Sequence, residues 1–269
     1  MKIVESPEIA TALLDQARSH RPHRTPGWHQ SHHNQCLRKS VVGAIIDKDD
    51  FGIDETRKLM FLRGEGIHAF LSEYRKEDVF KADDFGWCSI DRPWVLPDGS
   101  EIPMEIKTTR FSSGYPITDH PNYIHQLATY VVKRWHRDNP NAILLADTEL
   151  HGVVYVLYEQ GDYSEKRIEQ RAFLFTFTGQ ELLDWEAELS ARHHLMVDSY
   201  HNIVSSRKPD VLLAVERLKD LYQAEDDTLE KMLPPVGEHY YYECNLYGEC
   251  PIKELINCPG TGINARWKL

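Results

Sequence analysis

Residues 87–108, WCSIDRPWVLPDGSEIPMEIKT, decide the fold, because two strand-like runs flank the turn sequence Pro97-Asp98-Gly99. Pro-Asp-Gly favours a type I turn followed by a glycine in the left-handed region, which is the three-residue loop of a β-hairpin. Such a loop pairs Leu96 with Ser100. The stretch therefore predicts an antiparallel hairpin with a defined register.

That register gathers charged side chains on one face of the hairpin. It places Pro93 opposite Pro103, at a non-hydrogen-bonded pair where neither proline removes a ladder bond. It also places Asp91 opposite Glu105, and strand alternation points Lys107 to the same face as Glu105. Two neighbouring carboxylates repel each other unless a cation lies between them. The hairpin therefore predicts a site for a divalent metal ion.

The rest of the chain shows periodic patterns on both sides of the hairpin. Apolar residues spaced by three and four indicate helices, and strict alternation indicates strands. The predicted helices are 7–18, 59–74, 119–137, 179–206 and 209–224, the predicted strands are 142–147, 152–158 and 171–178, and 20–35 and 232–269 are predicted loops. The helix that starts at Asp119-His120-Pro121 should bury Ile124, Leu127, Ala128, Val131 and Trp135, and the last strand should place Phe173, Phe175 and Phe177 on one face. This order of elements predicts an α/β core with a mixed sheet.

The composition is that of a globular protein with an acidic balance. Hydrophobic residues make up 41% and charged residues 27% of the 269-residue chain, and the formal net charge is −11. A protein that coats nucleic acid would rarely be this acidic, although an enzyme whose site collects carboxylates can be. No run of eighteen apolar residues and no secretion signal is apparent, so we expect a cytoplasmic protein without a membrane partner.

The five cysteines point to metal binding rather than disulfides. An odd number of cysteines in a reducing compartment disfavours disulfide pairing. Cys36 lies early in the chain, and Cys244, Cys250 and Cys258 lie near its end. Cys88 falls within a strand, so we expect it to be a small buried apolar residue.

Three short sequence elements follow one another between residues 64 and 130. Asp91 is followed by Glu105-Ile106-Lys107, and this arrangement resembles the PD-(D/E)XK nuclease superfamily. Gly64-Glu65-Gly66-Ile67-His68 resembles the G-x-x-x-H element of its RecB-type branch, and Gln126-Leu127-Ala128-Thr129-Tyr130 resembles the Q-x-x-x-Y element. The resemblance implies a restriction-endonuclease-like core with a mixed central sheet flanked by helices. Within a single nuclease domain, 1–269, it implies a catalytic core at 36–178, a helical segment at 179–231 and a cysteine-rich, cluster-binding tail at 232–269.

The resemblance also implies a role for each matching residue. The implied metal ligands are His68, Asp91, Glu105 and the carbonyl of Ile106, and the implied catalytic residues are Asp91, Glu105, Lys107, Gln126 and Tyr130. Oxygen ligands suit Mg²⁺, and a histidine ligand makes Mn²⁺ favourable as well. Lys107 would position the attacking water, while Gln126 and Tyr130 would orient Lys107 or a phosphate oxygen.

One early and three late cysteines around such a core resemble the iron–sulfur subgroup of these nucleases, which includes CRISPR-associated exonucleases and AddB-type nuclease domains. The resemblance implies that Cys36, Cys244, Cys250 and Cys258 bind a [4Fe–4S] cluster that joins the two ends of the chain. The late spacing, C-x₅-C-x₇-C, is wider than the pair that the subgroup often shows. Zinc, or a site without metal, therefore stays an alternative, although typical zinc pairs are separated by two to four residues.

The expected function is a metal-dependent DNA exonuclease that hydrolyses phosphodiester bonds, on single-stranded DNA or free DNA ends. The resemblance implies the cytoplasm of a prokaryotic cell or phage-infected host as the location. Recombination, repair, phage replication and CRISPR adaptation are the expected settings, with recombination or CRISPR-adaptation proteins as partners. The alternative is an inactive nuclease-fold subunit that binds DNA or another protein and is stabilised by an iron–sulfur cluster. The intact set of His68, Asp91, Glu105 and Lys107 counts against that alternative.

Overall fold

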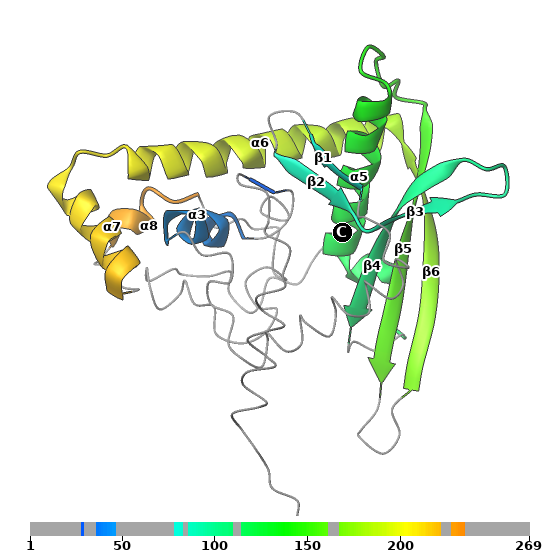
Figure 1. The fold of residues 1–269 in the computed structure, drawn as a ribbon, viewed down its shortest axis with the longest axis horizontal. Coiled ribbons are helices and arrows are strands. Elements are labelled where there is room, and N and C mark those ends of the chain that lie inside the picture. Colours follow the sequence, from blue (N-terminus) through cyan, green and yellow to red (C-terminus); the bar gives the residue numbers. More distant parts are fainter. Residues whose placement is uncertain are drawn as a thin grey trace, which may run out of the picture.

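The computed structural model describes residues 28–29, 36–46, 78–82, 86–109, 114–160, 167–221 and 227–234 (Figure 1). The strands are β1 (Asp78–Lys81), β2 (Trp87–Ile90), β3 (Arg92–Val95), β4 (Glu101–Thr109), β5 (Glu149–Gln160) and β6 (Arg167–Thr178). The helices are α3 (Leu37–Ile46), the 3₁₀ helix η2 (Ile117–Asp119), α5 (Pro121–Asp138), α6 (Gly179–Val204), α7 (Pro209–Leu221) and α8 (Asp227–Glu230). The predicted helices at 7–18 and 59–74 lie outside the described residues, as does most of the predicted loops at 20–35 and 232–269.

A four-stranded mixed sheet forms the centre of the fold, in the order β3-β4-β5-β6. β4 and β5 are parallel, and the two outer pairs are antiparallel. Parallel neighbours need a crossover connection, and α5 supplies it between β4 and β5. Figure 1 shows α5 lying against one face of this sheet. The chain is thus an α/β fold with a mixed sheet flanked by helices, as the sequence predicts.

The hairpin register is confirmed from Arg92–Met104 to Val95–Glu101, whereas the predicted Asp91–Glu105 pair is not part of the ladder, because the chain bends at Asp91. Pro93 pairs with Pro103 in the β3–β4 ladder, and the backbone nitrogen of Leu96 donates to the carbonyl of Ser100 over 2.8 Å. Gly99 has φ +85°, a left-handed conformation that glycine adopts without a steric cost. The local turn chemistry therefore sets which residues of β3 and β4 lie side by side.

The predicted first strand of the hairpin, 87–96, is wrong as one continuous strand, because the chain bends at Asp91. Trp87–Ile90 forms β2, which leaves the main sheet and pairs with β1 in a separate two-stranded sheet. The reason is burial. Cys88 and Ile90 turn inward and pack with Ala82, the residue that follows β1, and with Tyr130 of α5.

Helix α5 follows the predicted pattern closely. It begins at Pro121, the first helical position, where the missing N–H of proline costs no hydrogen bond. Leu127, Ala128 and Val131 are buried, and Ile124 and Trp135 pack against the same cluster. The approach to the sheet is close at Gly152 of β5, where a Cβ atom would lie 2.8 Å from Leu127 Cδ1.

Strands β5 and β6 and helices α6 and α7 occupy the predicted regions, with both strands longer than predicted. The predicted phenylalanine face is confirmed, since Phe173, Phe175 and Phe177 all join the core beneath α5 and α6. A capping box starts α6, in which Thr178 Oγ1 accepts from the Glu181 nitrogen and Glu181 Oε2 accepts from the Thr178 nitrogen. These reciprocal bonds satisfy two backbone donors and place the helix start directly after β6.

The predicted strand at 142–147 is wrong, since these residues form turns and irregular chain between α5 and β5. Of its apolar side chains, Leu144 is buried, whereas Ile143 is 84% exposed and Leu145 is 61% exposed. The run is apolar enough to suggest a strand, but within the described chain it pairs with no strand. It serves instead as the short return from the helix to the sheet.

A second core lies at the end of α6 that is farther from the four-stranded sheet (Figure 1). There α3, which has no counterpart among the predicted elements, packs with α6, α7 and α8 through Val41, Met196 and Leu218. Arg38 Nε donates to the carbonyl of Pro234 over 2.6 Å, which joins residues 196 positions apart. Of the helices in the described ranges, none has the length and apolar composition needed to cross a membrane.

A buried charge cluster holds α5 against α6. Lys133 is 2% exposed, and its Nζ donates to Glu186 Oε1 over 2.6 Å, while His136 Nε2 lies 3.0 Å from Glu186 Oε2. Burial alone would raise the pKa of Glu186, but Lys133 and then His136 outweigh it and lower this pKa below the ordinary value of 4.5. The carboxylate form is therefore stabilised by folding.

Glu186→Gln is expected to lower the free energy of unfolding by about 2 kcal/mol at neutral pH, because the buried Lys133 ammonium loses its carboxylate. A carboxyl whose folded pKa is depressed stabilises the protein above pH 4.5, and this contribution is lost as the pH falls through the folded pKa. The melting temperatures of wild type and variant should therefore converge in acid. Thermal unfolding followed by circular dichroism measures this, with Glu216→Gln on the exposed side of α7 as the control. A constant gap at every pH would contradict it.

Candidate active site

Two carboxylates meet where the small sheet joins the large one. Glu105 lies at the middle of β4 and is 1% exposed. Asp91 occupies the bend between β2 and β3, and its Oδ2 accepts a hydrogen bond of 2.8 Å from the backbone nitrogen of Ile106. The side chain of Asp91 thus takes over a backbone donor of β4 at the point where the β3 ladder ends. This bond fixes the Asp91 carboxylate beside the strand that carries Glu105.

Lys107 lies two residues beyond Glu105 on the same face of β4. Its Nζ forms an ion pair with Glu105 Oε1, donates to Gln126 Oε1 over 2.9 Å, and lies 5.6 Å from the centre of the Tyr123 ring. Burial opposes the charge on this ammonium, but Glu105 and then Asp91 outweigh burial and raise the pKa of Lys107. Lys107 is therefore a cation held at a defined point, with a side chain that remains 23% exposed.

Helix α5 supplies two side chains that restrain Lys107 through consecutive hydrogen bonds. Gln126 accepts from Lys107 and donates through Nε2 to the Tyr130 hydroxyl oxygen over 2.8 Å. Residues four apart share one helix face, so the Gln-x-x-x-Tyr spacing aims both side chains at β4. Burial, followed by the charges of Glu105 and Asp91, raises the pKa of Tyr130 well above its usual range. Tyr130 thus stays a neutral phenol whose hydroxyl can still donate.

The charge balance of this cluster suits a cation. Asp91 and Glu105 contribute two negative charges and Lys107 one positive charge, which leaves the site with a net negative charge. Carboxylate oxygens are the ligands that Mg²⁺ and Mn²⁺ prefer. Within the described ranges, no group of three or more His, Cys, Asp or Glu side chains forms a ready-made metal site. The two carboxylates fit a divalent ion, and the third implied side-chain ligand, His68, lies outside the described residues.

The structure brings together five of the residues that the sequence singles out: Asp91, Glu105, Lys107, Gln126 and Tyr130. Ile106 lies between two of them on β4, with its side chain buried on the opposite face of the sheet. Tyr123 was missed by the sequence analysis. Its position three residues before Gln126 is the signal that could have placed it on the same helix face.

Of the four cysteines predicted to bind a cluster, the structure describes one. Cys36 is half-buried and immediately precedes α3, while Cys244, Cys250 and Cys258 lie outside the described residues. The bond from Arg38 to Pro234 brings the end of the described chain to the first turn of α3. Cys88 is 1% exposed, and burial raises the pKa of its thiol, which confirms the expected small buried side chain.

Comparison with known proteins assigns this chain to no family. No protein-family model and no curated protein matches this chain. Among solved structures, the crystal structure of SSO0001 is similar with a TM-score of 0.42 and 16% sequence identity, over 68% of this chain and 85% of that one. The fold and site thus define an α/β protein with a mixed sheet, in which two carboxylates and a lysine meet beside a Gln–Tyr helix face.

Proposed function

We propose that this protein is a metal-dependent DNA exonuclease of the PD-(D/E)XK type, with a restriction-endonuclease-like core built from β3–β6 and α5. The observation that carries the proposal is the meeting of Asp91, Glu105 and Lys107 on one face of the sheet, with Lys107 held by both Glu105 and Gln126. Metal-dependent phosphodiester hydrolysis uses a carboxylate-bound cation and a positive group close to the phosphate. In this cluster the two carboxylates would bind the cation, and the Lys107 ammonium would be the positive group.

The carboxylates of Asp91 and Glu105 would hold Mg²⁺ or Mn²⁺, with His68 and the Ile106 carbonyl as the further ligands that the resemblance implies. When bound, the ion would lower the pKa of a coordinated water and offset charge on the phosphate. Lys107 would orient that water and stabilise the negative charge that develops on the phosphate oxygens. Gln126 restrains the Lys107 ammonium from behind, and Tyr130 restrains Gln126.

The proposed substrate is single-stranded DNA or a free DNA end. With a net charge of −11, the chain would attract DNA only where basic residues cluster, so contacts should be short and strongly salt-dependent. Recombination, repair, phage replication and CRISPR adaptation remain the settings in which such an activity would be used.

Wild-type protein is expected to degrade end-labelled DNA in Mg²⁺ or Mn²⁺ but not in EDTA, and Asp91→Asn is expected to be inactive. Asparagine keeps an oxygen that can accept from the Ile106 nitrogen, so this variant removes the charge and preserves the bond that positions the side chain. Asp198→Asn, at an exposed position of α6, is the matched control. The product ladder from each labelled end gives the polarity.

Intact DNA in every condition, from wild-type protein shown to be folded, would overturn the exonuclease proposal. DNA or protein binding without cleavage would then support the inactive subunit, which is the second candidate function.

We further propose that Cys36, Cys244, Cys250 and Cys258 bind a [4Fe–4S] cluster, with zinc as the alternative metal. The support is the contact between Arg38 and Pro234, since it brings the chain that leads to Cys244 close to the helix that follows Cys36. Four thiolates are the usual ligand set of such a cluster.

Cys36→Ser is expected to lower the iron and acid-labile sulfide content of protein purified without oxygen, and Cys88→Ala is expected to leave both unchanged. Cys88 is the suitable control because it is buried in the apolar cluster with Tyr130. Elemental analysis of the same samples decides the metal. Zinc in place of iron would select the alternative, and neither metal in the wild type would contradict the cluster.

A further inference from the structure

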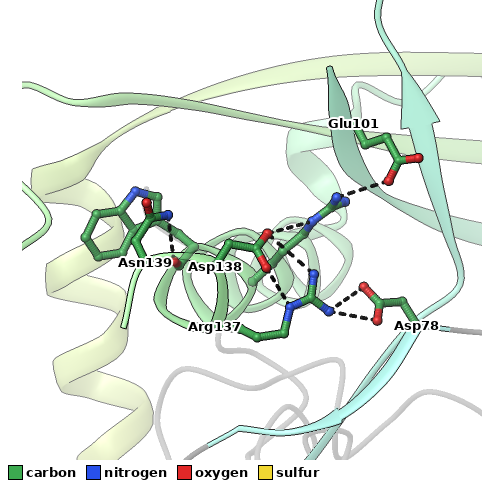
Figure 2. Close-up of polar contacts among 7 residues, drawn as sticks. Asp78, Glu101, Arg137, Asp138 and Asn139 are labelled. Atoms are coloured by element: carbon green, nitrogen blue, oxygen red, sulfur yellow. Dashed lines mark hydrogen bonds and ion pairs between the residues drawn. The ribbon is translucent and has the colours of Figure 1, made fainter. Parts of the chain in front are cut away.

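The last turn of α5 is tied to the small sheet by an arginine with two partners. Arg137 Nη1 lies 2.7 Å from each carboxylate oxygen of Asp78 in β1, and its Nε donates to Asp138 Oδ1 over 2.7 Å. Figure 2 shows Arg137 between these two carboxylates. The guanidinium also lies 4.6 Å from the ring centre of Phe80, the residue of β1 whose ring packs on the cluster containing Tyr130. Arg137 therefore contacts β1 in two ways, through an ion pair with Asp78 and through the aromatic ring of Phe80.

The same network reaches the strand that carries the site. Arg134 Nη2 donates to Glu101 Oε2 over 3.2 Å at the start of β4, and Arg134 Nε donates to Asp138 Oδ2 over 3.4 Å. Asp138 thus links the two arginines. In Figure 2, Glu101 and Asp78 both lie to the right of Asp138, with Glu101 above Asp78. One end of α5 is therefore fixed to β1 and to β4 at once.

These contacts lie on the helix face that serves the site. Gln126, Tyr130 and Arg137 are separated by four and seven residues, which keeps them on one side of α5. The Tyr130 side chain packs with Cys88 and Ile90 of β2. The small sheet therefore contacts α5 twice, through this apolar cluster and through the ion pair between Arg137 and Asp78. Ile90 is the residue directly before Asp91, so the placement of β2 sets the start of the bend that presents the Asp91 carboxylate.

We propose that Arg137 is a positioning residue, which through Asp78 and Phe80 fixes the β1–β2 sheet on α5 and thereby holds the Asp91 carboxylate beside Glu105. Its consequence for catalysis rests on the proposed nuclease function. Single ion pairs at this level of exposure add little to stability. The guanidinium is nevertheless restrained in orientation, because Nη1 bonds both oxygens of Asp78 while Nε bonds Asp138. Small displacements of a reacting group reduce rates far more than they reduce stability.

The bond from the Ile106 nitrogen to Asp91 Oδ2 reports the position of Asp91 without any assay of activity. Arg137→Ala and Asp78→Ala are each expected to speed hydrogen exchange of the Ile106 amide by about fivefold, measured by NMR, and the double variant should match either single variant. The Val154 amide of β5, next to Glu105 in the sheet, should exchange at an unchanged rate. Arg171→Ala, which removes an exposed arginine paired with Glu169 on β6, is the matched control.

In the cleavage assay, Arg137→Ala is expected to raise the Mg²⁺ concentration needed for half-maximal rate by more than it lowers the rate at saturating Mg²⁺. Arg137→Lys, which keeps the charge but cannot bond Asp78 and Asp138 through separate nitrogens of one planar group, should fall between wild type and alanine. An unchanged Ile106 exchange rate would overturn the proposal, and so would an equal increase at Val154, which would mean general loosening. If wild-type protein cleaves no DNA, the nuclease function fails, and the Ile106 exchange rates alone decide the role of Arg137.

Discussion

Glu105→Gln is expected to lower the rate of metal-dependent DNA cleavage by about a thousandfold or more. Glu105 is the buried carboxylate of the site, and it is also the ion-pair partner of Lys107. Glutamine has nearly the same shape but no charge, so it would bind a divalent cation poorly and leave Lys107 with a weaker restraint. The substitution thus removes both the proposed metal ligand and the main group that raises the pKa of the neighbouring lysine.

The decisive experiment measures two quantities for each variant: the rate of DNA cleavage and the affinity for Mn²⁺, the latter by calorimetry. Glu105→Gln should lose both, while Glu149→Gln, an exposed carboxylate at the start of the neighbouring strand β5, should lose neither. Circular dichroism establishes that the variants are folded. Cleavage by folded Glu105→Gln at the wild-type rate would place the chemistry elsewhere in the protein.

Lys107→Met is expected to lower the cleavage rate by about a hundredfold to a thousandfold while leaving metal binding intact. Methionine fills similar space but cannot donate to Gln126 or stabilise a phosphate oxygen. Because the Lys107 ammonium pairs with Glu105, its removal should let Mn²⁺ bind at least as tightly as in the wild type. Loss of rate without loss of the metal is the result that separates this residue from the carboxylates.

Single-turnover cleavage at saturating Mg²⁺ and calorimetry with Mn²⁺ test this separation. Lys219→Met, on the exposed surface of α7, is the matched control. In the metal-free protein, Glu105 and then Asp91 raise the pKa of Lys107 and keep its ammonium charged through neutral pH. If Lys107→Met cleaves as fast as the wild type, the proposed role of this lysine is wrong.

Local sequence chemistry predicts much of the site. The Pro97-Asp98-Gly99 turn sets the β3–β4 register from a few adjacent residues, and the Gln126–Tyr130 spacing sets one face of α5. Both depend on neighbours close in the chain, which a single sequence specifies well. The shared face of Glu105 and Lys107 follows from strand alternation, whereas Asp91 reaches them from a bend through its bond to the Ile106 nitrogen.

What the sequence does not predict depends on contacts between distant segments. The bend at Asp91 arises because Cys88 and Ile90 pack on Tyr130, and no local pattern distinguishes this from a continuous strand. The apolar run at 142–147 resembles a strand, yet it has no strand partner among the described residues. The pairing of Arg137 with Asp78 joins residues 59 positions apart, which charge patterns along the chain cannot indicate.

The contacts of this protein differ widely in the length of chain that each must close. The bond between Ile106 and Asp91 closes 15 residues, and the bond between Lys107 and Gln126 closes 19, whereas the bond between Arg38 and Pro234 closes 196. Loop-closure entropy grows with the logarithm of length, so the last contact costs about 2 kcal/mol more to form from an open chain than the first. We expect the cluster of Asp91, Glu105 and Lys107 to assemble early in folding and the contact between Arg38 and Pro234 to form late. Pulse-labelled hydrogen exchange at Ile106 and in α3 would reveal this order.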